Sequence, residues 1–128
     1  MNWDQFPNFS MNEFTCKCGC KTDNMDQDFM TSLQQLRTLY DKSMRISSGY
    51  RCAEHTAEKR KRTPGAHNTG KAADISVYGS DAWLLNHCAA QFPEFKGIGF
   101  KQKGLIENRF IHLDTVTVGI PRPALWSY

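Results

Sequence analysis

The chain has 128 residues, of which 40% are hydrophobic and 23% charged, with a formal net charge of +3. We expect one domain over residues 1–128, since this length suffices for a core without disulfide bonds. The charge is far below that of a typical nucleic-acid-binding domain. No apolar run approaches the roughly 20 residues that cross a bilayer. The start, MNWDQFPNFS, lacks the basic and apolar regions of a signal peptide, so synthesis in a cytosol is expected.

The first half of the chain predicts an aromatic arm, a helix, a short strand and a long loop. The arm covers residues 1–15 and is expected to pack on the domain through Trp3, Phe6, Phe9 and Phe14. Residues 26–43 predict a helix, because apolar side chains recur along one stripe and Asp26 or Asp28 can cap its start. A strand is expected over 44–48. Residues 53–71 read as a long loop with a helical turn at 54–61, and loops of this length are often functional.

The second half predicts three strands and one helix. Strands are expected over 72–78, 97–100 and 110–113, and a helix over 81–92 with Ser80 as its cap. The tail, GIPRPALWSY, is too rich in proline for regular structure to be expected. This order predicts an α+β domain with a small, mostly antiparallel sheet and helices on one side.

Five cysteines occur, at positions 16, 18, 20, 52 and 88. An odd number in a chain without an export signal argues against a disulfide framework. In an extended segment, the alternating Cys16, Cys18 and Cys20 would place their sulfurs on one face, where a second metal could bind with help from Cys52. The spacing differs from that of zinc ribbons and fingers, so reduced thiols remain the alternative.

A basic run, Lys59–Arg62, is the one concentration of positive charge. Such a run can contact nucleic acid or another anionic polymer. A solvated loop is the simpler interpretation, and no nucleic-acid partner is expected.

Four side chains suitable for binding a metal lie in two segments, GAHNTGKAADI at 65–75 and FIHLD at 110–114. If the strands at 72–78 and 110–113 pair, Asp74, His112 and Asp114 share one face, and the preceding loop can bring His67 over them. Two histidines and one aspartate form a zinc set that leaves a fourth position for water. Singly, each residue also fits a turn, a cap or a satisfied core histidine.

These segments resemble a known family. H-x-x-G-x-A-x-D-I at 67–75, preceded by SGYRC at 48–52 and followed by IHLD at 111–114, is similar to the zinc D-Ala-D-Ala carboxypeptidases, which include bacterial carboxypeptidases and phage endolysins. The resemblance runs from FTCKCGC at 14–20, which looks like the phage-type branch, to LDT at 113–115, with Trp126 as a further point. It implies a hedgehog/D-Ala-D-Ala peptidase-like fold with a zinc cleft.

The resemblance also implies roles for single residues. His67, Asp74 and His112 would bind one catalytic zinc ion. Arg51 would bind a substrate carboxylate or stabilise the oxyanion at the attacked carbonyl, although a surface salt bridge is the alternative. His55 would help to bind substrate or is a plain loop histidine.

The sequence departs from the family at two positions. Gly65 stands where relatives often have serine, so a supporting hydrogen bond is expected to be missing. Arg109 stands where many relatives carry the carboxylate that acts as general base. Asp114 is then the favoured base and Glu107 the second choice, while Asp114 could instead orient a zinc ligand.

The expected function is that of a zinc metallopeptidase acting on the stem peptides of bacterial peptidoglycan, as a D-Ala-D-Ala carboxypeptidase or an endopeptidase. A monomeric phage endolysin or virion-associated hydrolase fits, made in the host cytoplasm and delivered to the periplasm or cell wall by a holin or an infecting particle. The alternative is a non-catalytic zinc-containing structural or wall-binding domain of a phage tail, suggested by Gly65 and Arg109.

Overall fold

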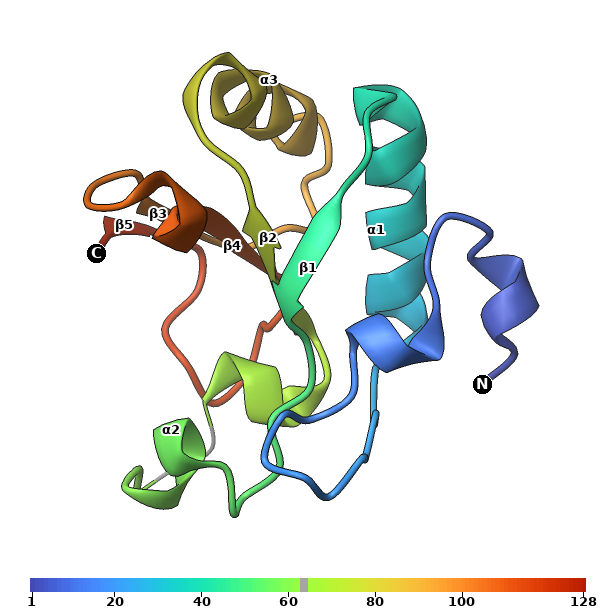
Figure 1. Cartoon of the computed structure of the whole chain (residues 1–128), viewed down its shortest axis with the longest axis vertical. Coiled ribbons are helices and arrows are strands. Elements are labelled where there is room, and N and C mark those ends of the chain that lie inside the picture. Colours follow the sequence, from blue (N-terminus) through green and yellow to red (C-terminus); the bar gives the residue numbers. More distant parts are fainter. Residues whose placement is uncertain (63–64) are drawn as a thin grey trace.

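The computed structural model describes residues 1–62 and 65–128, and a five-stranded sheet forms its centre (Figure 1). The strand order is β1-β2-β4-β3-β5. The strands are β1 (Arg45–Ser48), β2 (Ala72–Ser76), β3 (Gly97–Lys101), β4 (Phe110–Asp114) and β5 (Ala124–Ser127). Three of the pairings, β1 with β2, β2 with β4 and β4 with β3, are antiparallel, and β5 runs parallel to β3. The expected α+β fold with a mostly antiparallel sheet is therefore confirmed.

Two longer helices, α1 (Gln27–Tyr40) and α3 (Gly79–Ala89), and one short helix, α2 (Thr56–Lys59), accompany the sheet. Asp26 caps α1 as predicted, since its carboxylate accepts a hydrogen bond of 2.9 Å from the backbone N–H of Phe29. The prediction that Ser80 caps the other helix is wrong. The chain turns into α3 at Gly79 (φ +63°), so Tyr78 occupies the cap position and Ser80 lies within the first turn.

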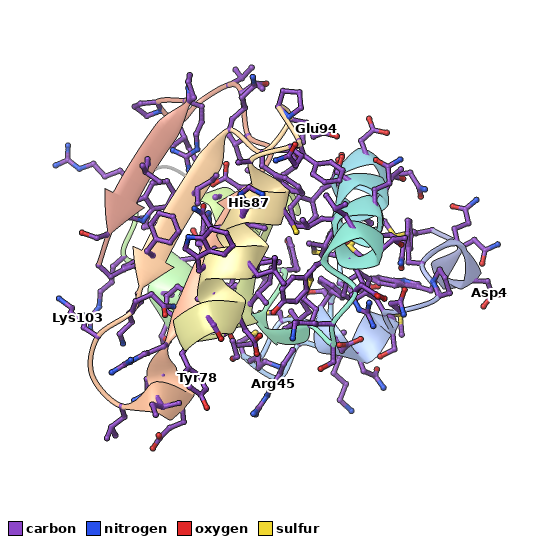
Figure 2. The ribbon with its side chains drawn as sticks, turned by 90° about the horizontal axis from the view of Figure 1, so that it is seen from above. Asp4, Arg45, Tyr78, His87, Glu94 and Lys103 are labelled. Carbon is purple, nitrogen blue, oxygen red and sulfur yellow. The ribbon has the colours of Figure 1, made fainter. Side chains whose placement is uncertain are left out.

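Successive side chains along β2 and β4 point to opposite faces of the sheet, one facing the hydrophobic core and one polar. Side chains of odd-numbered residues pack with α1 and α3 in one buried cluster; among them are Ala73, Ile75, Ile111 and Leu113. Both helices lie on the same side of the strands (Figure 2). The opposite face carries Asp74, His112 and Asp114, which are also buried. One face of the sheet therefore supplies the hydrophobic core, and the other presents polar groups away from it.

The N-terminal arm packs on the domain, as expected from its aromatic residues. Phe6, Phe9 and Phe14 are buried, and the rings of Phe9 and Phe14 meet edge to face with centroids 5.6 Å apart. Phe14 also fixes the chain that follows β1. Its carbonyl accepts a hydrogen bond of 3.0 Å from the N–H of Tyr50, and its backbone lies so close to Gly49 that no larger side chain fits there.

The tail contains a strand, so the prediction that it has no regular structure is wrong. β5 adds to β3 at the edge of the sheet, with Gly97 opposite Ala124 and Gly99 opposite Trp126. Pro121 and Pro123 precede the strand, where a missing N–H costs no ladder hydrogen bond. The prolines therefore mark where the strand begins.

Gly70 and Gly104 provide a matched test of the contact between the loop before β2 and the backbone of Asn24. Both have a left-handed backbone, with φ of +76° and +77°. A methyl group at Gly104 would meet open space, whereas one at Gly70 would overlap the backbone carbonyl of Asn24. We expect Gly104→Ala to lower the free energy of unfolding by roughly 1–2 kcal/mol. Gly70→Ala should cost about 1–3 kcal/mol more.

Urea unfolding of the two variants beside the unchanged chain measures both effects. Equal losses of stability would show that the contact between Gly70 and Asn24 does not constrain the loop.

Candidate metal centre and cleft

Three buried side chains from three elements meet on the polar face of the sheet. Asp74 comes from β2 and His112 from β4, and the strand register places them directly opposite each other. His67 comes from a single 3-10 turn, Ala66–Thr69, just before β2. One donor atom from each residue lies within 4.8 Å of the other two. The structure thus brings together the three residues that the sequence singled out as metal ligands.

Both histidines are oriented by a hydrogen bond at the ring nitrogen that faces away from Asp74. His67 donates from Nδ1 to the carbonyl of Gly49 over 2.8 Å, and His112 donates from Nε2 to Oδ2 of Asp114 over 2.6 Å. The remaining nitrogens, Nε2 of His67 and Nδ1 of His112, lie 3.1 and 3.0 Å from the same oxygen of Asp74.

In neutral rings, these remaining nitrogens carry lone pairs. Two lone pairs directed at a carboxylate oxygen repel it unless a cation lies among the three atoms. A set of two imidazoles and one carboxylate is one that zinc accepts, and a hydrogen-bond acceptor behind each histidine is characteristic of such sites. The residues present therefore fit a zinc ion.

The charge of Asp74 supports this fit. Without a metal ion, the two facing ring nitrogens can instead carry protons and donate to Asp74. Burial would raise the pKa of the Asp74 carboxyl, but these hydrogen bonds from His112 and His67 outweigh burial and keep that pKa well below its usual range. For His112, burial would lower the pKa of the ring, while Asp114 and Asp74 raise it. The site thus contains an ionised carboxylate surrounded by groups that attract a positive charge.

Asp114 is completely buried and paired with Arg122. The guanidinium donates from Nε to Oδ1 over 2.9 Å and from one terminal nitrogen to Oδ2 over 2.7 Å. Gly97, opposite Asp114 in β3, leaves the space that this pair occupies. The expectation that Asp114 is the general base is not supported, because both oxygens are engaged and no part is exposed. These contacts favour the alternative, in which Asp114 orients His112.

Glu107 and Arg109 both lie away from the metal centre. Glu107 belongs to the 3-10 turn Ile106–Asn108 and lines a hollow with Ser76 and Tyr78, separate from the cleft over the ligands. It is therefore not placed to act as the base. Arg109, at the position where the resemblance led us to expect a carboxylate, donates two hydrogen bonds to the carbonyl of Gly104 and closes the turn between β3 and β4.

Arg51 lies in the cleft, as expected. Its Nε donates to Ser48 Oγ over 3.1 Å, and a terminal nitrogen lies 3.4 Å from Oδ2 of Asp74. Its backbone N–H donates to the carbonyl of His67 over 3.1 Å, so the loop before the ligand fixes the arginine. His55 instead caps α2 by accepting a hydrogen bond from the N–H of Ala57, and it does not line the cleft. Its placement favours the structural role over substrate binding.

Comparison with known proteins agrees with this geometry. The sequence model of the family described as Peptidase M15 matches residues 7–114. The chain belongs to the peptidase M15 family. Peptidases of this family are zinc-dependent, and the fold described above is consistent with theirs. No curated protein matches the chain.

The M15 match ends at β4, yet β5 and the segment before it complete the cleft. Arg122, Trp126 and Tyr128 line it together with the ligands, in a volume of about 620 Å³. The indole of Trp126 lies 5.2 Å from the ring of His112, and the Arg122 guanidinium lies 5.0 Å above the same indole. Sequence reasoning missed Arg122 and Tyr128, which flank β5 on either side; their separations of four and two residues from Trp126 were the available signal, since residues an even number apart in an extended segment share a face.

Glu58 is a second residue that the sequence did not reveal. It is buried, and its carboxylate accepts hydrogen bonds of 3.0 Å from the N–H of Gly65 and 3.1 Å from Nζ of Lys61. A side chain at Gly65 would meet this carboxylate and the ammonium of Lys61. In this M15 chain, Glu58 thus fixes the backbone at Gly65, two residues before His67.

We expect the alanine variants of His67, Asp74 and His112 each to lose one bound zinc ion per chain, because each removes one of three donors. Metal analysis after dialysis against buffer with trace zinc measures the loss. His87→Ala is the control, since His87 is exposed on α3 (Figure 2) and stacks on Trp83. Unchanged zinc in all three variants would place the metal elsewhere, with the cysteines as the first alternative.

Asp114→Asn tests the orienting role of the buried carboxylate. The amide keeps the size of the side chain but loses the charge that holds His112 and Arg122, so zinc affinity should fall about 10–100-fold. Competition with a chromophoric zinc chelator measures the affinity, with the exposed Asp4→Asn as the control. Unchanged zinc affinity combined with lost hydrolysis would restore Asp114 as the proton acceptor.

Proposed function

We propose that this chain is a zinc metallopeptidase that cleaves peptide bonds in the stem peptides of bacterial peptidoglycan, as a D-Ala-D-Ala carboxypeptidase or an endopeptidase. The observation that carries the proposal is the cleft, whose floor is formed by the His67, Asp74 and His112 set. Membership of the M15 family supports the same chemistry at the level of a zinc peptidase acting on peptidoglycan.

Each cleft residue has a role in this proposal. His67, Asp74 and His112 would hold the zinc ion, and bound zinc supplies Lewis acidity that polarises a carbonyl and lowers the pKa of water. Arg51, fixed by Ser48 and by the carbonyl of His67, would bind the developing oxyanion or a substrate carboxylate.

The basic run contributes to the same cleft. Lys61 and Arg62 line it, so part of the run interpreted above as a solvated loop would face a substrate bound in the cleft. With Arg51 they form a cationic rim around the ligands. Such a rim suits peptides with several carboxylates, a property of peptidoglycan stem peptides, and the proposed partner is therefore the wall polymer rather than nucleic acid.

One observation favours a second function. Among the cleft-lining residues that the structure describes, Asp74 is the only carboxylate, and it is one of the proposed metal ligands. A hydrolase needs a group that accepts the proton of the attacking water. The second candidate is therefore a non-catalytic zinc-containing domain that binds the wall or forms part of a phage tail.

For the setting, we propose a phage endolysin or virion-associated hydrolase that works as a monomer in the periplasm or cell wall. The opening FTCKCGC, which resembles the phage-type branch, supports this setting. Within residues 1–62 and 65–128, no helix combines the length and the apolar character that crossing a membrane requires.

Digestion of purified sacculi tests the function. The protein as isolated should release defined soluble peptides, lose this activity on chelation and regain it with zinc. Mass spectrometry of the fragments identifies the bond that is cut. Asp74→Asn should be at least about 100-fold slower through loss of the metal site, while Asp81→Asn on the exposed surface of α3 serves as the control.

Zinc bound at one equivalent in the triad without release of any peptide would contradict the peptidase. That result would favour the binding domain, and co-sedimentation with sacculi would then distinguish wall binding from a purely structural role.

A further inference from the structure

Four of the five cysteines gather at a second place, away from the cleft. The sulfurs of Cys16, Cys18, Cys20 and Cys52 all lie within 4.8 Å of one another. In Figure 1 the blue segment after the N-terminal arm passes beside the green loop that follows β1, which is where these residues meet. The fifth, Cys88, is buried in the hydrophobic core on α3.

The CKCGC segment forms a turn and is not extended, which corrects the sequence-based expectation. Gly19 and Lys21 have positive φ values of +100° and +59°, and the N–H of Cys16 donates to the carbonyl of Thr22 over 2.7 Å. The turn brings its three thiols to one side. Cys52 approaches from the other segment, and its N–H donates to the sulfur of Cys16 over 3.4 Å.

The sulfur separations suit a shared metal ion. Cys52 Sγ lies 3.7 Å from Cys16 Sγ and 3.3 Å from Cys18 Sγ. Four sulfurs at about 2.3 Å from a central zinc ion, in a tetrahedron, lie roughly 3.8 Å apart. A disulfide needs about 2.0 Å between one pair only. Four sulfurs within 4.8 Å of one another can surround one ion, and the two separations from Cys52 are both close to the tetrahedral value and longer than a disulfide bond.

We propose that Cys16, Cys18, Cys20 and Cys52 bind a second zinc ion through four thiolates, and that this ion fastens the N-terminal segment to the loop that carries Arg51. Four protein ligands leave no open position, so the site is structural. Three of the ligands lie within five residues of the chain, and the fourth is far away in sequence. The ion therefore cross-links two segments that otherwise meet through few hydrogen bonds.

The location of Cys52 connects this site to the cleft. Cys52 directly follows Arg51, whose N–H donates to His67 and whose carbonyl accepts a hydrogen bond of 2.9 Å from the amide of Asn68. The backbone on either side of Arg51 is thus held by the loop of a metal ligand and by the cysteine cluster. Loss of the second ion would free this backbone and the arginine before it disturbed the hydrophobic core.

Metal counting under reducing conditions tests the proposal. The full chain should contain two zinc ions, and a variant combining His67→Ala with His112→Ala should keep one. Cys18→Ser should lower the count by one, while Cys88→Ser should leave it unchanged. Because the count in the double histidine variant does not depend on hydrolysis, failure of the peptidase function and failure of this site give different results.

Two measurements on the unaltered protein remain informative if a cysteine variant fails to fold. Cobalt in place of zinc should give the intense near-ultraviolet absorption of thiolate-to-cobalt charge transfer. Bound zinc should also slow alkylation of the four clustered cysteines by iodoacetamide at least about tenfold, read by mass spectrometry of peptides. Three results would each overturn the proposal. They are a double histidine variant that contains no zinc, an alkylation rate that does not change with zinc, and disulfides among the four cysteines in freshly isolated protein.

Discussion

Two carboxylates, Asp74 and Asp114, are buried on the same face of the sheet, and each must have positive or hydrogen-bonding partners to remain there. The antiparallel register of β2 and β4 brings the two carboxylates close together, because it places Asp74 opposite His112. Asp114 lies two residues after His112 on the same strand and points to the same face. His112 lies between the two carboxylates. As a neutral ring it donates to Asp114 from Nε2, while its Nδ1 faces Asp74. Arg122 neutralises Asp114, whereas Asp74 meets Arg51 through one contact of 3.4 Å and its other oxygen faces the two histidines, where a metal ion would complete the compensation.

The remaining parts of the cleft follow from this arrangement. β3 lies beside β4 with Gly97 and Gly99 opposite Asp114 and His112, so that the space above them stays open for Arg122 and Trp126. β5 must therefore run along β3 for the buried pair to form. Residues after the M15 match are thus linked to the metal centre, because Arg122 pairs with the buried charge of Asp114, the last matched residue.

The sequence allowed the α+β fold, α1 with its cap at Asp26, and the meeting of His67, Asp74 and His112 to be predicted, because these depend on local periodicity and on two strands pairing face to face. It did not allow the partner of Asp114 to be predicted. Arg122 acts over a contact that exists only once β5 joins the sheet, and the prolines beside it suggested a loop. The same limit applies to the expectation that Asp114 is the general base, because the strand pattern predicts its position but not that Arg122 donates to both of its oxygens.

The segment from Gly49 to Gly70 connects the cleft with the cysteine cluster, although its described residues, 49–62 and 65–70, form only short helical turns. Gly49 orients His67, Arg51 reaches Asp74, and Cys52 reaches Cys16. Polar contacts hold this segment in place, whereas hydrophobic packing holds β2 and β4 in place. A four-thiolate metal would add a covalent-like restraint where such packing is thin, since Cys18 and Cys20 are exposed. The geometry of the arginine would then depend on a metal that takes no part in hydrolysis.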